Sequence, residues 1–243
     1  MSRTVVVTGG ARGIGRATVE RFAAGGERVI ALGRDGAALA KLGDADAFVC
    51  DVTDEHAVAA TFAEIGDVDV LVNSAGMGES APLAATTLQS WCQHLAVNAT
   101  GAFLCIRAVV PGMRERGAGA VVTVASTAGR AGVPYTAAYS ASKHAVIGLT
   151  RAVASEVAGT GVRVNAVCPT FVRTDMTARS VDTIVARTGR SADQAEAALA
   201  AAAPLGRLLE PEEVADAIVF LSSPAAAAIN GQAVVIDGGG VQA

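Results

Sequence analysis

Tyr139 and Lys143 lie four residues apart, and Ser126 lies thirteen residues before the tyrosine. Residues four apart share one face of an α-helix, so a helix over residues 137–158 would place the phenol beside the ammonium. The pKa of a free tyrosine is about 10, and a nearby positive charge favours the phenolate. The spacing therefore predicts a lowered pKa for Tyr139 and a general acid or base for carbonyl and alcohol chemistry. The alternative for this pair alone is a Tyr and a Lys on the surface of an amphipathic helix.

The elements that would position these side chains alternate between short apolar runs and longer helical patterns. Apolar runs typical of buried parallel strands occupy residues 5–8, 28–32, 47–50, 70–72, 120–125, 162–167 and 233–236. Helical patterns occupy residues 13–25, 36–42, 54–65, 87–97, 100–116, 137–158 and 211–222. This alternation predicts an α/β fold: a Rossmann-type doubly wound sheet of seven parallel strands with helices on both faces, in a single domain over residues 1–243.

One segment, Thr170–Pro204, interrupts the alternation. It has no strand pattern, is rich in alanine and polar residues, and is long for a connection. Such insertions are often lids or binding loops, so we predict a substrate lid over about residues 170–208, with an ordinary helical excursion as the alternative. The lid arginines could meet a phosphate or carboxylate, but we expect them to be solvated and paired with lid carboxylates. The arginines are Arg173, Arg179, Arg187 and Arg190, and the carboxylates are Asp175, Asp182, Asp193 and Glu196.

The composition excludes several classes of protein. Of the 243 residues, 51% are hydrophobic and 17% are charged, which excludes a disordered chain. The net charge of −4 and the lack of a basic cluster argue against a nucleic-acid partner. No apolar run has the length of a membrane span and the N-terminus has no signal-peptide pattern, so we expect a cytoplasmic protein without a membrane partner.

The cysteines and histidines do not suggest a metal site. The cysteines show no Cys-x-x-Cys spacing, and the three histidines share no ligand spacing with them. We therefore expect no metal and four reduced, buried thiols, at Cys50, Cys92, Cys105 and Cys168.

A glycine-rich turn follows the first predicted strand. Gly9, Gly13 and Gly15 allow a tight turn whose backbone can approach a pyrophosphate, and a helix begins beside them. The N-terminus of that helix offers free N–H groups and a partial positive charge to phosphates. In an alternating β/α chain, this turn predicts a dinucleotide cofactor.

The end of the second predicted strand indicates which dinucleotide is bound. NAD-binding proteins commonly place a carboxylate there for the ribose 2′-hydroxyl, whereas this strand ends in Gly33 followed by Arg34. Arg34 and Arg12 could together hold a 2′-phosphate. We therefore predict NADPH/NADP as the cofactor, with NAD as the alternative if Asp35 binds the ribose instead.

Taken together, these motifs resemble the short-chain dehydrogenase/reductase family, in its compact single-domain branch, over essentially the whole chain. Seven markers occur in the family's order: Thr8-Gly9-x-x-x-Gly13-Ile14-Gly15, Asp51-Val52, Asn73-Ser74-Ala75-Gly76, Asn98, Ser126, Tyr139-x-x-x-Lys143 and Pro169. Two positions depart from the family pattern. Ser74 replaces the commoner asparagine, and Thr170 replaces the usual glycine after Pro169.

The resemblance implies a role for each marker. Tyr139 is the acid/base, and Ser126 hydrogen-bonds the substrate oxygen. Lys143 holds the nicotinamide ribose and lowers the tyrosine pKa, while Asn98 seats a water that links the lysine to solvent. Asn98 as a helix cap, and Ser126 or Asp51 as turn formers, are the structural alternatives. The residues expected to bind the cofactor are Gly9, Arg12, Gly13, Ile14, Gly15, Arg34, Asp51, Val52, Asn73, Ala75, Gly76, Tyr139, Lys143, Pro169, Val172 and Thr174.

The resemblance also narrows the activity. Residues 139–150 and 164–169 are similar to bacterial 3-oxoacyl and aromatic-polyketide ketoreductases. They imply an NADPH-dependent ketoreductase for a 3-oxoacyl thioester, a polyketide-like compound or another medium-sized hydrophobic carbonyl compound. Gly117 and Thr160 stand where carrier-protein-dependent ketoreductases tend to have arginines, so a free ketone or a coenzyme A (CoA) thioester is favoured over a carrier-bound substrate.

Two alternative functions and one oligomeric state complete the predictions from the sequence. The alternative functions are an NAD-dependent secondary-alcohol or 3-hydroxyacyl-CoA dehydrogenase and a non-catalytic nucleotide-sensing or scaffold protein. The resemblance also implies a homotetramer, joined through the helices near 100–116 and 137–158 and through the final helix and strand.

Overall fold

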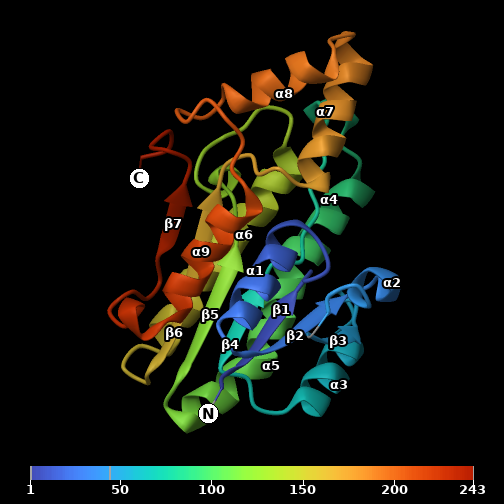
Figure 1. The fold of residues 1–243 in the computed structure, drawn as a ribbon. Helices are drawn as coiled ribbons and strands as arrows, with labels where there is room; N and C mark the ends of the chain where they lie inside the picture. Colours follow the sequence, from blue (N-terminus) through green and yellow to red (C-terminus); the bar gives the residue numbers. More distant parts are fainter. Residues whose placement is uncertain (1, 44, 243) are drawn as a thin grey trace.

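The computed structural model describes residues 2–43 and 45–242, and its centre is a sheet of seven parallel strands (Figure 1). The order across the sheet is β3-β2-β1-β4-β5-β6-β7, so the chain leaves β1 toward one edge and returns to β4 on the other side of β1. Doubly wound folds bind ligands in the crevice that this reversal creates at the carboxyl ends of the strands. All seven predicted strands are confirmed, as β1 Thr4–Thr8, β2 Arg28–Gly33, β3 Asp46–Val49, β4 Val70–Asn73, β5 Gly119–Val124, β6 Val162–Pro169 and β7 Ala233–Ile236.

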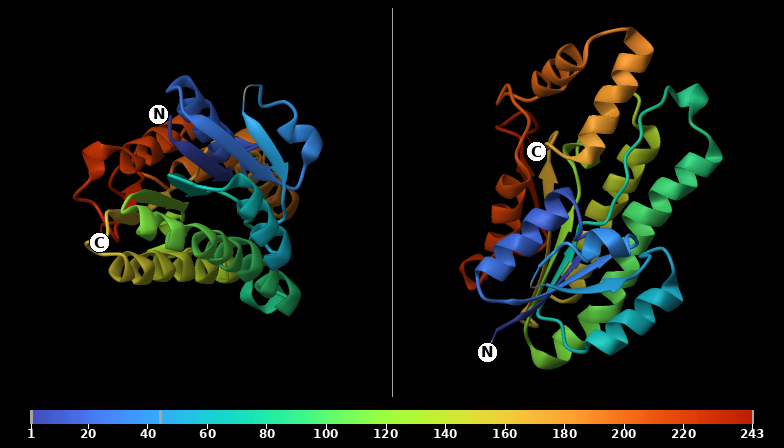
Figure 2. Two further views of the ribbon diagram at one scale, coloured as in Figure 1. Left: turned by 90° about the horizontal axis from the view of Figure 1, so that it is seen from below. Right: turned by 45° about the vertical axis from the view of Figure 1, so that its right-hand side comes forward.

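Successive side chains of each strand point to opposite faces of the sheet, and each face has its own apolar core. Val6, Leu71 and Val121 belong to the core that is covered by α3 Glu55–Ile65, α5 Gly101–Arg116 and α6 Ala137–Glu156. Val5, Val72 and Val122 belong to the core that is covered by α1 Gly13–Ala24 and α9 Pro211–Ser222. Figure 2 shows these two helical layers on either side of the sheet. The short α2 Gly36–Leu39 lies beside β2 and β3.

The helices predicted over residues 87–97 and 100–116 form one continuous helix, Leu88–Arg116. It consists of α4 Leu88–His94, a π-helical turn Leu95–Thr100 and α5. Cys92 lies on α4 and is exposed, so the expectation of four buried thiols is wrong for this cysteine. The expectation that no segment matches a membrane span is wrong for this helix, which is long and apolar enough to cross a membrane. Its buried side chains, among them Leu104, Ile106 and Met113, nevertheless pack in the core beside the sheet. Helices in the cores of other proteins can have the same length and apolar composition.

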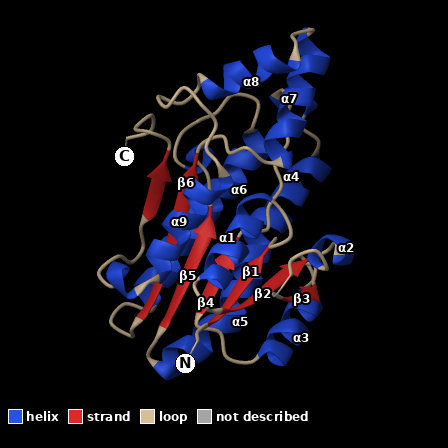
Figure 3. Ribbon diagram, viewed as in Figure 1, coloured by secondary structure: helices blue, strands red, loops and turns tan. Residues whose placement is uncertain are grey.

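The segment between β6 and α9 contains two helices that were not predicted in detail, α7 Asp175–Thr188 and α8 Ala192–Ala200. They stand over the carboxyl ends of the strands, as Figure 3 shows. Thr177 and Val181 are the buried residues of α7, so most of this helix faces either solvent or the space above the sheet. The structure therefore combines the two alternatives: the segment is a helical excursion, and it lies where a lid would lie.

Candidate active site

The carboxyl ends of the strands open into a long cavity of about 1390 Å³, which extends from the glycine turn to α7 and α8. Ser126, Tyr139 and Lys143 line it together, as their spacing predicted. Most of the expected cofactor residues also line it, namely Gly9, Arg12, Gly13, Ile14, Arg34, Asp51, Val52, Ala75, Gly76, Pro169, Val172 and Thr174. Three of the expected residues do not contribute to its described lining: Gly15, Asn73 and Asn98.

The glycine turn forms a cradle that side chains would fill. Gly9 and Gly13 have φ angles of 66° and 51°, which favour glycine. A Cβ atom on Gly15 would lie 2.2 Å from the carbonyl oxygen of Gly9, so the turn can close only because residue 15 has no side chain. The first turn of α1 has neither a side-chain cap nor an acidic residue. Its N–H groups therefore remain available to an anion, which fits a dinucleotide pyrophosphate.

At the adenosine end, both predicted phosphate-binding arginines have acidic partners. Arg12 Nη2 lies 2.5 Å from a carboxylate oxygen of Asp35, and Arg34 Nη1 lies 3.8 Å from Asp51. Asp35 also caps α2 by accepting a hydrogen bond from the N–H of Ala38. That N–H, together with the Arg12 guanidinium, lowers the pKa of Asp35. Asp35 therefore caps α2 and forms an ion pair with Arg12, neither of which the sequence predicted.

Asp51 combines its predicted role with the structural alternative. Its Oδ1 accepts hydrogen bonds from the backbone N–H and the hydroxyl of Thr53, so the residue does form the turn after β3. The same residue and Val52 line the cavity beside Leu32, at the end where an adenine ring would lie. The turn therefore fixes both residues at the wall of the cavity.

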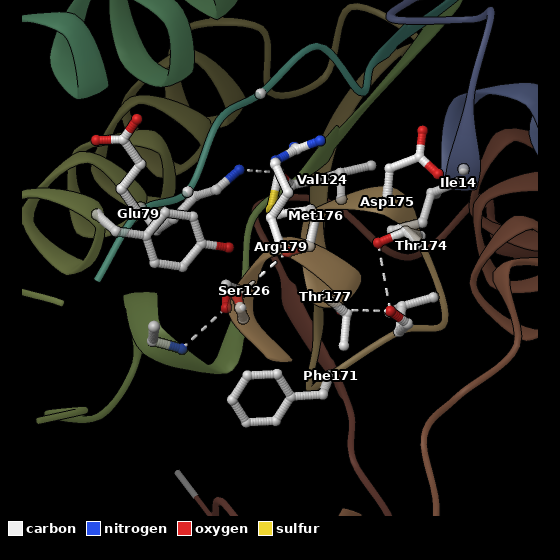
Figure 4. A pocket seen from close by; sticks show the side chains of 18 of the residues that line it. Ile14, Glu79, Val124, Ser126, Phe171, Thr174, Asp175, Met176, Thr177 and Arg179 are labelled. Carbon is white, nitrogen blue, oxygen red and sulfur yellow. Dashed lines mark hydrogen bonds between the residues drawn. The ribbon is translucent and has the colours of Figure 1, made fainter. Parts of the chain in front are cut away.

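Ser126 follows β5 and is almost fully buried. Its Oγ accepts the N–H of Ala128 at 3.1 Å, which confirms the turn-forming alternative (Figure 4). A hydroxyl that accepts one hydrogen bond can still donate its own hydrogen, so Ser126 remains able to bind an oxygen in the cavity.

The relation between Tyr139 and Lys143 differs from the prediction. Lys143 Nζ donates a hydrogen bond of 2.8 Å to the carbonyl oxygen of Val124 and lies 5.7 Å from the centre of the Tyr139 ring. Burial raises the pKa of Tyr139 above its ordinary value, and the Ser126 hydroxyl opposes this only in part. The predicted lowering is therefore wrong in this structure, because desolvation of the phenol dominates its pKa and the Lys143 ammonium does not contribute to the shift. A phenol that stays protonated is the form that can act as a general acid.

Lys143 itself is 5% exposed, and burial lowers its pKa from 10.5 to about 8. Below pH 8 the lysine is charged in both the folded and unfolded states, so the folded state carries the whole cost of burying the charge. Between about pH 8 and 10.5 the unfolded state binds more protons, so stability rises with pH over this range. At about 1.4 kcal/mol for each pKa unit, the cost is on the order of 3 kcal/mol.

We expect Lys143→Met to be more stable than the wild type near pH 7. Loss of the hydrogen bond to Val124 offsets about 1 kcal/mol of the gain. The difference between the two free energies of unfolding should narrow as pH rises from about 8 toward 10.5, because the wild-type lysine becomes neutral in the folded state. Urea unfolding of both proteins at pH 7 and 9.5 measures this. A variant that is less stable at pH 7, or a difference that widens at pH 9.5, would contradict the expectation.

Asn98 lies in the π-helical turn Leu95–Thr100 and is buried. Its Oδ1 accepts the N–H of Met77, and its Nδ2 donates to the Met77 carbonyl and to the hydroxyl of Ser142. The helix-cap alternative is therefore wrong, since Asn98 lies inside a continuous helix. Its amide instead joins the loop after β4 to the α6 residue next to Lys143. π-helical turns of this kind occur frequently at functional sites. The water relay that the resemblance implies stays a prediction.

The loops after β4 and β6 complete the wall of the cavity. The hydroxyl of Thr8 accepts the N–H groups of Ser74 and Ala75, so the backbone carries this link and the departure at residue 74 does not interrupt it. On the other side, Thr170 N–H donates to the Ile236 carbonyl. Thr174 lies so close to Gly13 that a Cβ atom there would be 3.0 Å from Thr174 Cγ2. The segment after Pro169 therefore reaches back to the glycine turn, as expected for a segment that contributes cofactor-binding residues.

Sequence reasoning missed His94, which is 1% exposed. Its Nε2 accepts the N–H of Glu79 at 3.1 Å, and its Nδ1 lies 2.7 Å from the Ser90 carbonyl, so Nδ1 carries the hydrogen. The imidazole also packs edge-on against Tyr139, with ring centres 6.4 Å apart. His94 therefore supports both the phenol ring of Tyr139 and the loop at Glu79. The available signal was its position four residues before Asn98, on one helix.

The chain is similar to known oxidoreductases over almost its whole length. A family model described as enoyl-(acyl carrier protein) reductase matches residues 9–240. D-threitol dehydrogenase of Mycolicibacterium smegmatis is 41% identical over 98% of this chain and 92% of its own. Cis-4-hydroxycyclohexanecarboxylate dehydrogenase of Sinomonas cyclohexanicum is 41% identical over 98% and 96%. A crystal structure of an actinorhodin polyketide ketoreductase variant with NADPH superimposes with a TM-score of 0.94, at 37% identity over 98% and 97% of the two chains.

Proposed function

Because the chain belongs to the short-chain dehydrogenase/reductase family, it is an NAD(P)-dependent oxidoreductase, and we propose that it is an NADPH-dependent ketoreductase. Its proposed substrate is a ketone, either a 3-oxoacyl thioester or another medium-sized hydrophobic carbonyl compound. One observation carries the proposal. The hydroxyl of Ser126, the phenol of Tyr139 and the ammonium of Lys143 line the same cavity as the glycine turn.

In this proposal each of these groups has a step in the reduction. A reduced nicotinamide, when bound along the glycine turn, supplies the hydride to the carbonyl carbon. Tyr139 gives its phenolic proton to the carbonyl oxygen, so hydride and proton together produce the alcohol. Ser126 donates a hydrogen bond to the same oxygen, where negative charge develops. Lys143 places a positive charge near the phenolate that remains, and solvent then reprotonates it.

NADPH is preferred in this proposal for two reasons. Arg12 and Arg34 line the adenosine end of the cavity, and Gly33 leaves no carboxylate at the end of β2. The similar polyketide ketoreductase was also crystallised with NADPH. The ion pair between Arg12 and Asp35 opposes the preference, because a 2′-phosphate must share Arg12 with a carboxylate.

We expect Asp35→Asn to bind NADPH several-fold more tightly, since it frees Arg12 and removes a negative charge near the 2′-phosphate. The pair is exposed and therefore weak, which limits the gain to roughly fivefold. Asparagine caps a helix as well as aspartate does, so α2 is preserved. Titration of nucleotide fluorescence measures both affinities, with NADH as the control that should not gain. Weaker NADH binding and unchanged NADPH binding would instead identify Asp35 as a ribose ligand.

The activity itself is tested by following nicotinamide absorbance with both cofactors. Candidate substrates are simple ketones, diketones and 3-oxoacyl thioesters, with a 2-enoyl thioester included because of the description of the family model. Reduction of a ketone with NADPH supports the proposal. Reduction of the enoyl substrate alone, or of no carbonyl compound under any condition, rejects it.

A second candidate is an NAD-dependent secondary-alcohol or 3-hydroxyacyl-CoA dehydrogenase. The Arg12–Asp35 pair favours it, and two similar proteins are named as dehydrogenases. Such an enzyme would run the same reaction in the direction of alcohol oxidation. Tighter binding of NADH than of NADPH would favour this function over the NADPH-dependent ketoreductase. The non-catalytic alternative receives no support, because the catalytic set is complete.

We further propose that the protein is cytoplasmic and forms a homotetramer. The assembly is supported by large apolar side chains on the helices expected at the contacts: Phe103 on α5 is 42% exposed and Phe220 on α9 is 48% exposed. Sedimentation velocity would show a monomer if the assembly is wrong.

A further inference from the structure

One face of α7 lines the cavity above the catalytic residues. Its members follow helical spacing, and the two long charged side chains among them are Arg179 and Arg187. Both arginines also line a second cavity of about 480 Å³, which lies between α7 and residues 78–94. Since a helix rises about 1.5 Å per residue, the two arginines are spaced by about 12 Å along α7.

Arg179 is the nearer of the two to the chemistry. A Cβ atom on Gly78 would lie 3.1 Å from Met176 Sδ and 3.2 Å from Tyr139 Cε2. Met176 and the Tyr139 ring therefore lie on either side of Gly78, with little room between them for a further methyl group. Arg179 follows Met176 by one helical turn. Figure 4 shows Met176 and Arg179 extending from α7 into the pocket, with Glu79 on its other side.

The lid arginines divide into two kinds, which corrects the expectation that all are paired. Arg173 binds Glu196 at 2.8 Å and Glu210 at 3.1 Å. Arg179 and Arg187 form no ion pair with any described residue, even though Asp175 and Asp182 belong to the same helix. Two cations on the wall of a cavity without protein counter-ions are available to an anion in that cavity.

The carboxylates that share the cavity form no ion pair with these arginines in the described part of the chain. Asp175 lines the cavity at the first residue of α7, one turn before Arg179. Asp35 and Asp51 lie at the adenosine end and pair with other arginines. Glu79 lines both cavities, and its Oε2 lies 3.4 Å from the hydroxyl of Ser90, on the wall formed by α4. Beyond Asp175, the α7 wall therefore carries the two positive charges, whereas the opposite wall carries the negative charge of Glu79. This arrangement orients a charged substrate with its anion toward Arg179 and Arg187.

We propose that Arg179 and Arg187 bind an anionic group of the substrate, a phosphate or a carboxylate carried by the ketone. The proposal rests on the ketoreductase function and names its substrate class. Arg179 is placed for an anion close to the reacting carbonyl, as in an oxo acid. Arg187 is placed for an anion at the far end of a longer molecule, as in a CoA thioester.

The test uses three substrates with the same 3-oxobutanoyl group: acetoacetyl-CoA, the neutral acetoacetyl-N-acetylcysteamine thioester, and acetoacetate. Steady-state kinetics with NADPH are measured for the wild type, Arg179→Gln and Arg187→Gln. Arg190→Gln is the matched control, because Arg190 follows α7, lines neither cavity and has no ion pair in the described chain. Loss of a charge-assisted hydrogen bond should raise KM for a charged substrate by about tenfold or more.

The outcomes separate the sources of the anion. A higher KM for acetoacetyl-CoA alone identifies phosphate, and a higher KM for acetoacetate identifies carboxylate; in both cases KM for the neutral thioester and the Arg190→Gln control should stay unchanged. An equal rise for the neutral thioester, or no rise at all, overturns the inference and leaves the ketoreductase function intact. If the wild type reduces none of the three, the proposed function fails for acetoacetyl substrates and is decided by the wider screen of ketones and diketones. Calorimetric binding of acetoacetyl-CoA in the presence of NADP then still decides the inference, since unchanged affinity in both variants rejects it.

Discussion

Tyr139→Phe is expected to lower the turnover number for ketone reduction by about 10³- to 10⁴-fold, at the upper end of what general acid catalysis contributes. The phenol is the proposed proton donor and lies beside Ser126 on the cavity wall, and phenylalanine keeps its ring and its contact with His94. Nucleotide affinity should change little, because the glycine turn and the two arginines of the adenosine end are untouched. Single-turnover reduction and fluorescence titration measure the two quantities separately.

The control for this variant is the other tyrosine of the chain. Tyr135→Phe removes the same hydroxyl from a side chain that is 66% exposed, and it should leave turnover nearly unchanged. If Tyr139→Phe retained more than about a tenth of wild-type turnover, the acid would have to be another group, because general acid–base catalysis normally contributes at least about 10²-fold.

Gly15→Ala should disable nucleotide binding and destabilise the fold. The added Cβ atom would lie 2.2 Å from the Gly9 carbonyl oxygen and 2.8 Å from the Gly9 carbonyl carbon. Both atoms belong to the backbone, so the turn itself must move. Its N–H groups would then no longer point toward the pyrophosphate. We expect a loss of stability of about 3 kcal/mol, at the upper end of the cost of overpacking, together with at least a hundredfold loss of nucleotide affinity. Urea unfolding and nucleotide titration measure these effects.

Gly148→Ala provides the matched control, since an added Cβ atom at that exposed position of α6 would meet nothing within 4 Å. Alanine inside a helix is favoured over glycine by roughly 0.5–1 kcal/mol, so this variant should be at least as stable as the wild type. Equal effects of the two substitutions would show that the contact at Gly9 does not govern the turn.

The strands, the glycine turn and the catalytic helix followed from the sequence because each depends on nearby residues. The run Val5–Thr8 is apolar on both faces, which suits only a strand covered on both sides. The spacing of Tyr139 and Lys143 depends on a single helix, and α6 supplies it. The lid helices were harder to predict, because α7 has few buried residues and therefore a weak apolar pattern.

Local pattern thus determined the fold, and it predicted the residues of the dinucleotide site and the reacting groups. Only the tertiary structure decided the charge state of each side chain. That state depends on burial from water and on charged partners that are distant in sequence. Burial, not the ammonium one helical turn away, decides the direction of the Tyr139 pKa. Arg12 meets Asp35 only when β1 and β2 lie side by side. Arg179 forms no ion pair within residues 2–43 and 45–242, although Asp175 and Asp182 lie near it in sequence. Spacing along a chain specifies which side chains can meet, whereas solvation and competition among partners specify their charge.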